Sequence, residues 1–133
     1  MDNDSQYIDY HHQLISLLRI SLAKLVADGD EEAGSLPEDL IEKLDAIDSN
    51  EQAGEEFYQT GQEFICRLVG GFPQLTHLIA RDLFWFFGGD CLHYMPDEEI
   101  EIFQQLDELR AIANAADEQF DYREARASVL QLQ

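Results

Sequence analysis

Apolar residues recur at alternating steps of three and four through residues 7–26, YIDYHHQLISLLRISLAKLV. One row along this segment is Ile8, His11, Ile15, Leu18, Leu22 and Leu25, and a second row is Tyr7, Tyr10, Leu14 and Leu17. This period is that of an amphipathic α-helix with a wide apolar face. The sequence therefore predicts one helix of about six turns. We expect Ser5 to cap its N-terminus and Asp28-Gly29 to end it.

The same period recurs along the rest of the chain, between turns marked by proline and glycine. We expect helices over residues 38–47, 55–69, 73–87 and 97–116, and a last helix in the tail after residue 121. Acidic connectors at about 28–36 and 48–54 and a break at about 88–96 separate them. Residues 35–38, SLPE, have the spacing of a capping box, with Pro37 in the first turn.

No segment alternates as a strand does, and no repeat is present. The sequence thus predicts an all-α protein in which residues 1–133 form a single domain, a helical bundle of about five to six helices with no sheet. We expect Gly61, inside the helix over 55–69, to mark the close approach of another helix. The inner faces of two other helices are expected to be Leu40, Ile41, Leu44 and Ile47, and Ile102, Phe103, Leu106, Leu109, Ile112 and Ala113.

Four aromatic residues crowd into the segment Leu83–Phe87 at the end of one predicted helix. Side chains at successive positions of a helix point in different directions, so the four rings cannot all face one core. Either helices pack on both sides of this segment, or part of it is exposed as a binding patch.

Charge limits the partners that the protein can bind. The chain has 28 acidic and 8 basic residues, a net charge of −20. Phosphate backbones and anionic membranes require clusters of lysine and arginine, which the sequence lacks. We therefore expect no direct nucleic-acid binding and no membrane binding, whereas a basic protein surface is a suitable partner. The alternative is that the acidity only keeps the protein soluble.

The longest apolar run is only the five residues Leu83–Phe87, far short of the roughly 20 that span a bilayer. The N-terminus carries Asp2 and Asp4 where a signal peptide has positive charge. We therefore expect a cytoplasmic protein with its two cysteines, Cys66 and Cys91, reduced.

Metal-ligating residue types gather after the aromatic segment, where Asp90, Cys91 and His93 precede three more acids. The paired spacings of a zinc site and the Glu-x-x-His pairs of a di-iron site are both missing. The residues 28–39 also fail the register of a calcium loop. His11, Cys91 and His93 remain the metal-ligand candidates, but we expect no metal or other cofactor. No catalytic motif is present, so we expect no enzyme.

Two polar residues fall on apolar helix faces. His11 lies between Ile8 and Ile15, where a structural histidine is the favoured interpretation. Asp82 lies on the apolar face of the helix over 73–87, and a buried carboxylate needs a partner. We expect a structural ion pair with a distant base such as Arg67 or Arg110.

These observations favour a non-catalytic acidic protein-interaction module, an adaptor, chaperone or inhibitor that engages a basic or hydrophobic protein partner. The residues expected to contact the partner are Phe84, Trp85, Tyr94, Asp30, Glu31, Glu32, Asp97, Glu98 and Glu101. One alternative is a small-ligand or metal-binding helical protein with His11, Asp82, Cys91 and His93 near a pocket. Another is a homo-oligomeric structural protein, such as a homodimer closed by Phe84–Phe87.

Overall fold

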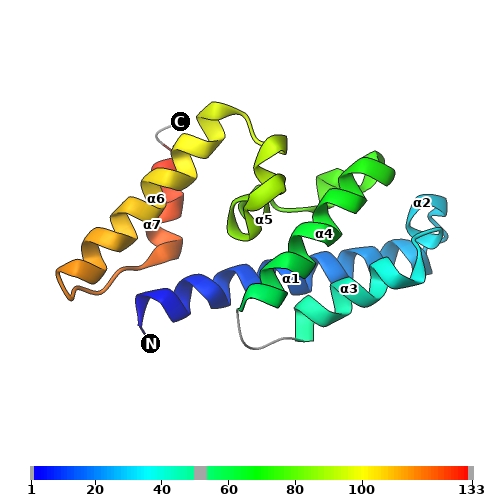
Figure 1. The fold of residues 1–133 in the computed structure, drawn as a ribbon, viewed down its shortest axis with the longest axis horizontal. Helices are drawn as coiled ribbons and strands as arrows, with labels where there is room; N and C mark the ends of the chain where they lie inside the picture. Colours follow the sequence, from blue (N-terminus) through cyan, green and yellow to red (C-terminus); the bar gives the residue numbers. More distant parts are fainter. Residues whose placement is uncertain (1, 50–53, 132–133) are drawn as a thin grey trace.

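The protein is all-α in the computed structural model, which describes residues 2–49 and 54–131 (Figure 1). The predicted fold class is confirmed, since none of the described residues forms a strand. No helix in this part of the chain is long and apolar enough to cross a membrane. The elements are α1 (Asn3–Ala27), α2 (Glu31–Gly34), α3 (Glu38–Ser49), α4 (Glu55–Gly71), the 3₁₀ helix η1 (Pro73–Leu78), α5 (Arg81–Phe87), the 3₁₀ helix η2 (Gly89–Tyr94), α6 (Asp97–Ala115) and α7 (Tyr122–Gln131).

The long helix α1 extends through most of the length of the molecule, and α2, α3, η1, α5 and α7 contact it (Figure 1). At one end, α2 reverses the chain so that α3 returns antiparallel to α1, and α4 packs on α3. At the other end α6 and α7 pack together, and α7 also contacts α1. The short helix α5 lies between these two parts and contacts α1, α4 and α6.

The beginnings of α1 and α3 differ from the sequence-based expectation. Asp2, not Ser5, caps α1, because the Asp2 carboxylate accepts a hydrogen bond of 2.7 Å from the backbone N–H of Ser5. The capping box predicted before α3 does not form. The acidic connector instead folds into α2, and the Ser35 hydroxyl donates to the carbonyl of Glu32 at the end of that helix. Pro37 precedes α3, where its carbonyl accepts from the N–H of Leu40.

The single helix predicted over 73–87 is two helices. Ile79 and Ala80 are extended between η1 and α5, with ψ of 117° and 136°. Both Leu75 before the bend and Leu83 after it are buried, so the bend lets the two helices turn their apolar faces into one core. The predicted break at 88–96 also contains η2, and Gly88 and Gly89 reach it through positive φ of 66° and 57°.

Gly61 brings α4 and α5 together, as its place in the sequence predicts. A Cβ atom at this position would lie 2.0 Å from Cε1 of Phe87, which is far inside van der Waals contact. Phe87 is itself buried in the core, so its ring has little room to move. The absence of a side chain at Gly61 therefore allows the closest contact between these helices.

Four apolar residues that were expected to face inward are on the surface. Leu17 is 57 % exposed and Ile112 is 66 % exposed, and Ile41 and Leu109 are exposed as well. The apolar faces of α1, α3 and α6 are wider than the surfaces that the neighbouring helices cover. The periodicity thus finds the buried row of each helix but overestimates its width.

The contact at Gly61 predicts that two glycine substitutions in α4 have very different effects on the free energy of unfolding. Gly61→Ala should lower the free energy of unfolding by about 1–3 kcal/mol, because the added methyl group displaces Phe87. Gly70→Ala is the matched control, since open space surrounds Gly70, and it should be neutral or stabilising by up to about 1 kcal/mol. Urea unfolding followed by circular dichroism measures both. Equal stability of the two variants would contradict the contact.

Candidate functional site

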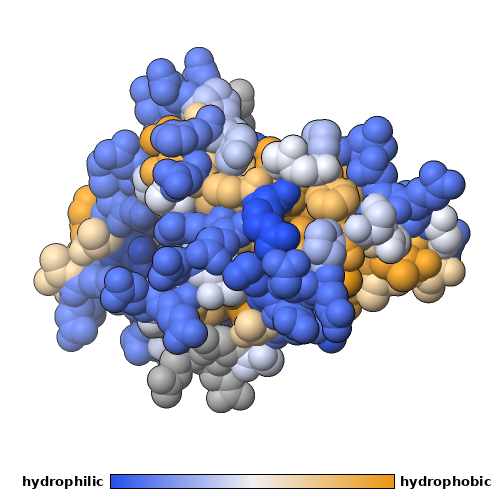
Figure 2. Space-filling view, turned by 45° about the vertical axis from the view of Figure 1, so that its right-hand side comes forward, coloured by the Kyte–Doolittle hydropathy of each residue, from blue (hydrophilic) through white to orange (hydrophobic). Residues whose placement is uncertain are grey.

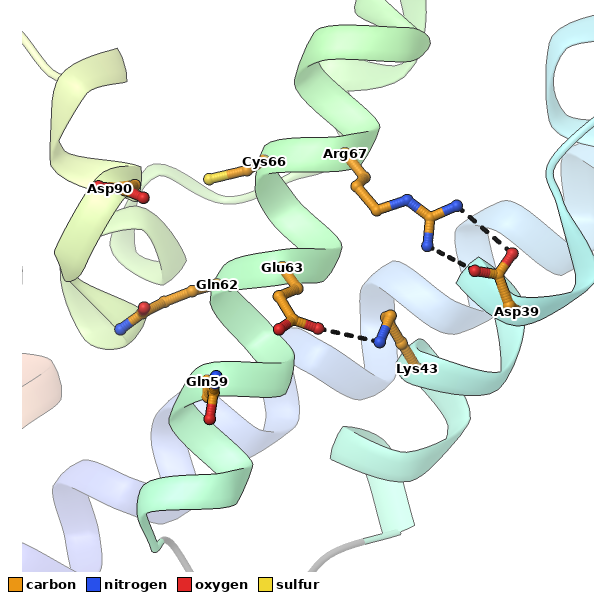
Figure 3. Close-up of a pocket in the computed structure, with 8 residues that line it drawn as sticks. All are labelled: Asp39, Lys43, Gln59, Gln62, Glu63, Cys66, Arg67 and Asp90. Carbon is orange, nitrogen blue, oxygen red and sulfur yellow. Dashed lines mark hydrogen bonds and ion pairs between the residues drawn. The ribbon is translucent and has the colours of Figure 1, made fainter.

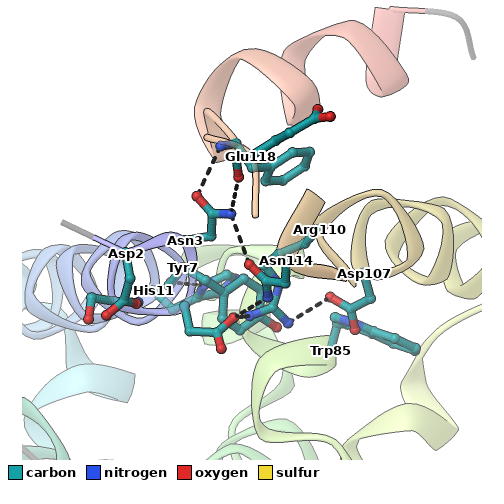
Figure 4. A network of polar contacts seen from close by, with 12 residues as sticks. Asp2, Asn3, Tyr7, His11, Trp85, Asp107, Arg110, Asn114 and Glu118 are labelled. Carbon is teal, nitrogen blue, oxygen red and sulfur yellow. Dashed lines mark hydrogen bonds and ion pairs between the residues drawn. The ribbon is translucent and has the colours of Figure 1, made fainter. Parts of the chain in front are cut away.

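The aromatic segment of α5 lies in the core, so the expectation that Phe84 contacts a partner is wrong. Phe84, Phe86 and Phe87 are buried, because α1, α4 and α6 all contact α5. Trp85 is half-buried, and its indole Nε1 donates a hydrogen bond of 2.9 Å to Asp107 of α6 (Figure 4). Phe84, Phe86 and Phe87 are therefore not available for contact with a second copy of the chain, whereas Trp85 is partly accessible.

Tyr94 is the one of the three predicted aromatic contacts that is exposed, at 40 %. It ends η2 beside the first turn of α6, where Asp97, Glu98 and Glu101 are also exposed. Arg81 holds this region together by donating to the carbonyl of Tyr94 and to the carboxylate of Glu99, both at 2.7 Å. The structure thus places Tyr94 among the predicted acids of α6.

The second predicted acidic group lies on α2, far from the first turn of α6 (Figure 1). Asp30 caps α2 by accepting a hydrogen bond of 2.9 Å from the N–H of Ala33. Glu31 is exposed and Glu32 is half-buried. The predicted partner-binding residues therefore form two separate acidic surfaces, one on α2 and one on α6.

Nearly all the positive charge of the protein is engaged between helices. Six of the eight basic residues form ion pairs that join two different helices, and Arg123 of α7 donates to Gln13 of α1. Lys24 is the only base with no ion pair or side-chain hydrogen bond to the described residues. The shortest inter-helix ion pair of each of these six bases is Arg19–Asp45, Lys43–Glu63, Arg67–Asp39, Arg81–Glu99, Arg110–Asp4 or Arg126–Asp82.

A polar hollow of about 590 Å³ opens between α3, α4 and η2 (Figure 3). Two ion pairs lie on one side of it, Arg67–Asp39 at 2.7 Å and Lys43–Glu63 at 2.9 Å. None of the side chains that line it is buried, so water keeps these charges solvated. The hollow therefore lacks the desolvated acid or base that general acid–base catalysis uses.

Cys66 lines this hollow and Cys91 lies buried behind it, with both thiols free. The Cys91 thiol is directed toward the carbonyl of Gln62, at 4.0 Å. Burial raises the pKa of Cys91 to about 12, and the adjacent Cys66 thiol contributes to the shift. Cys91 is therefore a protonated thiol at neutral pH and a poor nucleophile.

His11 is buried between aromatic rings in the centre of the fold. Its Nδ1–H donates to the carbonyl of Tyr7 at 2.7 Å, and its ring stacks on Phe86 at 4.5 Å. Its Nε2 has no hydrogen-bond partner among the described residues. Burial lowers the pKa of His11 to about 4, so the ring is neutral at pH 7.

The alternative pocket of His11, Asp82, Cys91 and His93 does not form. His93 is exposed on η2 and Cys91 contacts α4, whereas His11 is enclosed by Tyr7 and Phe86. Within residues 2–49 and 54–131, no three His, Cys, Asp or Glu side chains are placed to hold a metal ion.

Asp82 is buried and forms the expected structural ion pair, but its partner is Arg126 of α7. The two guanidinium bonds to the carboxylate measure 2.6 and 2.9 Å. The two predicted partners form other ion pairs, Arg67 with Asp39 and Arg110 with Asp4. Because Asp82 and Arg126 are 44 residues apart, local sequence patterns do not reveal this pair.

A polar network that the sequence did not indicate joins the start of α1 to α6 (Figure 4). The buried Asn3 side chain donates to Asn114 and to the carbonyl of Glu118, both at 2.9 Å. Arg110 pairs with Asp4, and its guanidinium lies 3.7 Å from the centre of the Tyr7 ring. This network fixes α1 against α6 and has a structural role.

An apolar groove of about 190 Å³ lies between α1, α2 and α3. Orange side chains gather on the side of the molecule on which α2 lies (Figure 2). Val26 of α1 is 48 % exposed and Ile41 of α3 is 42 % exposed. The sequence did not indicate this site, although Val26 and Ile41 lie on either side of the acidic connector. The groove is lined by Arg19, Leu22, Ala23, Val26, Ala33, Leu36, Ile41, Leu44, Asp45 and Phe64.

Together the fold and its surface define an acidic, all-helical protein. Its chain belongs to the PA2817-like family, whose model matches residues 3–133. No curated protein and no solved structure matches the chain.

Burial of His11 predicts a loss of stability at acid pH. The unfolded chain protonates His11 near pH 6.5, whereas the folded protein keeps it neutral down to about pH 4. Unfolding therefore takes up a proton between these pH values. The contribution of neutral His11 to the free energy of unfolding is fully present above pH 6.5 and falls by roughly 3 kcal/mol toward pH 4. Urea unfolding at several pH values should show this slope in the wild type and in His77→Gln, but not in His11→Gln. Equal slopes in the two variants would contradict the prediction.

The different environments of the two cysteines predict different reactivity. In the folded protein at pH 8, Ellman's reagent should titrate Cys66 and leave Cys91 unreacted, because Cys91 is buried and protonated. Unfolding in denaturant should release the second thiol. Cys91→Ser should retain the reactive thiol, and Cys66→Ser should lose it. Reaction of both thiols at one rate in the folded wild type would show that Cys91 is accessible.

Proposed function

We propose that this protein is a non-catalytic acidic protein-interaction module that binds a basic or hydrophobic protein partner, as an adaptor, chaperone or inhibitor does. The observation that supports this proposal most strongly is that most of the basic side chains form ion pairs within the protein. Six of eight basic residues bind carboxylates between helices, while most acids in the part of the chain that the structure describes have no such partner. The surface is therefore rich in uncompensated negative charge.

The exposed acids lie where a partner can approach them. Glu31 is exposed on α2, and Asp97, Glu98 and Glu101 are exposed on the first turns of α6. Carboxylates of this kind attract a basic surface over about 8–10 Å at physiological salt and accelerate its association. They add specificity because an acidic partner is repelled.

The burial of three candidate reactive residues supports a binding role over a catalytic one. His11, Asp82 and Cys91 are all buried, and Asp82 is engaged by Arg126. Catalytic residues have to reach a substrate, whereas these side chains are enclosed by the core. Their positions are those of groups that stabilise the fold.

A salt-dependent pull-down tests this proposal. The tagged protein, incubated with lysate of its native host at about 50 mM salt, should retain one stoichiometric protein that elutes as salt rises toward about 0.5 M. A variant with Glu31→Gln, Asp97→Asn, Glu98→Gln and Glu101→Gln should elute the same partner at lower salt. Its matched control is Asp9→Asn, Glu55→Gln, Glu56→Gln and Glu108→Gln, which removes the same number of exposed acids elsewhere and should elute the partner at higher salt than the test variant does.

Two results would contradict the proposal. One is an empty column at low salt with a correctly folded protein. The other is a small-molecule ligand or a stoichiometric metal in the purified protein, with no protein partner retained.

A further inference from the structure

We propose that the apolar groove between α1, α2 and α3 holds the apolar side chains of a basic amphipathic segment of a partner protein. This inference rests on the proposed function and assigns the contact site and the chemistry of the partner. The groove residues lie on α1, α2, α3 and α4 and, with Leu36, between α2 and α3, at the end of the fold where α2 lies (Figure 1).

The groove is an apolar hollow with accessible walls. Leu22, Leu44 and Phe64 are buried and form its floor. Val26 and Ile41 project from two different helices and are about half exposed. An apolar side chain of a partner placed between them would remove both from water, which is a favourable contact.

The size of the groove favours a protein side chain over a small-molecule ligand. Ligand pockets usually enclose about 300–1,000 Å³. The groove offers about 190 Å³, which is room for one or two side chains. Anchor residues of protein interfaces occupy pockets of this kind, at the centre of a larger polar contact.

The charge around the groove selects a basic partner. Glu38 lies one turn before Ile41 on α3 and Glu31 is exposed on α2, and neither forms an ion pair with the residues that the structure describes. The single cation that lines the groove, Arg19, is paired with Asp45 at 2.6 Å. A segment with lysine or arginine beside its apolar residues would meet these carboxylates.

The same charges disfavour a second copy of this chain as the occupant. Each copy carries a net charge of −20, and six of its eight bases are already engaged by its own carboxylates. Two such surfaces repel each other at close range. A basic segment from another protein gains attraction where a second copy meets repulsion.

A model peptide tests the groove directly. The probe is a fluorescein-labelled amphipathic helix of leucine and lysine, about 18 residues long, and binding is measured by fluorescence anisotropy at about 100 mM salt. Val26→Ser with Ile41→Ser should weaken its binding about tenfold or more. Leu17→Ser with Ile20→Ser is the matched control, because these exposed residues are 57 % and 61 % accessible and do not line the groove. The control should bind within about twofold of the wild type.

Two further peptides separate charge from apolar contact. A leucine–glutamate peptide of the same length should not bind, because the acids repel it. A serine–lysine peptide should bind more weakly than the leucine–lysine peptide, because it carries the charge but no apolar side chains for the groove. It should bind the wild type and both double variants equally. Circular dichroism of all variants confirms that they are folded.

The outcomes distinguish the groove from the general function. If both double variants bind the leucine–lysine peptide equally more weakly than the wild type, the groove is not the contact site. That result would not contradict the proposed function. Failure of the leucine–lysine and serine–lysine peptides to bind the folded wild type, even at about 20 mM salt, argues against both. A wild-type dimer in sedimentation that Val26→Ser with Ile41→Ser converts to monomer overturns the inference by making a second copy the occupant.

Discussion

Scarcity of positive charge is the constraint under which this fold is built. With 28 acids and 8 bases, helices that pack together bring carboxylates toward one another. Six of the bases lie between two helices, where one cation offsets repulsion on both sides. An exposed ion pair by itself contributes at most about 1 kcal/mol. The position of each pair matters more for the packing of the helices, because each pair joins acidic segments that would otherwise repel each other.

The pair Asp82–Arg126 differs from the others because its carboxylate is buried. A buried charge without a partner costs several kcal/mol, so α5 and α7 depend on each other. Arg126 reaches Asp82 only with α7 in place, and the docked helix also buries Tyr122 beside His11. One ion pair thus links the end of the chain to the aromatic centre of the fold.

How far the sequence predicts this structure depends on whether a feature is local. The hydrophobic periodicity and the turn residues depend only on neighbouring positions in the sequence. They predicted the all-α class, the positions of most helices and the contact at Gly61. The exposure of Leu17 and Ile112, the burial of Phe84 and the partner of Asp82 depend on which helices pack where. Helical periodicity describes one helix at a time, and the groove beside Val26 exists only once four helices meet.

The exposure of Val26 and Ile41 and the acidity have one physical explanation if this surface serves a partner. An exposed apolar patch on a neutral protein promotes self-association. A strong net charge opposes that association between identical copies but not with a protein of opposite charge. The groove lined by Val26 and Ile41 lies on such a surface, beside the exposed Glu31 and Glu38. Acidity that only kept the protein soluble would leave the positions of these apolar side chains unexplained, whereas a basic partner accounts for both.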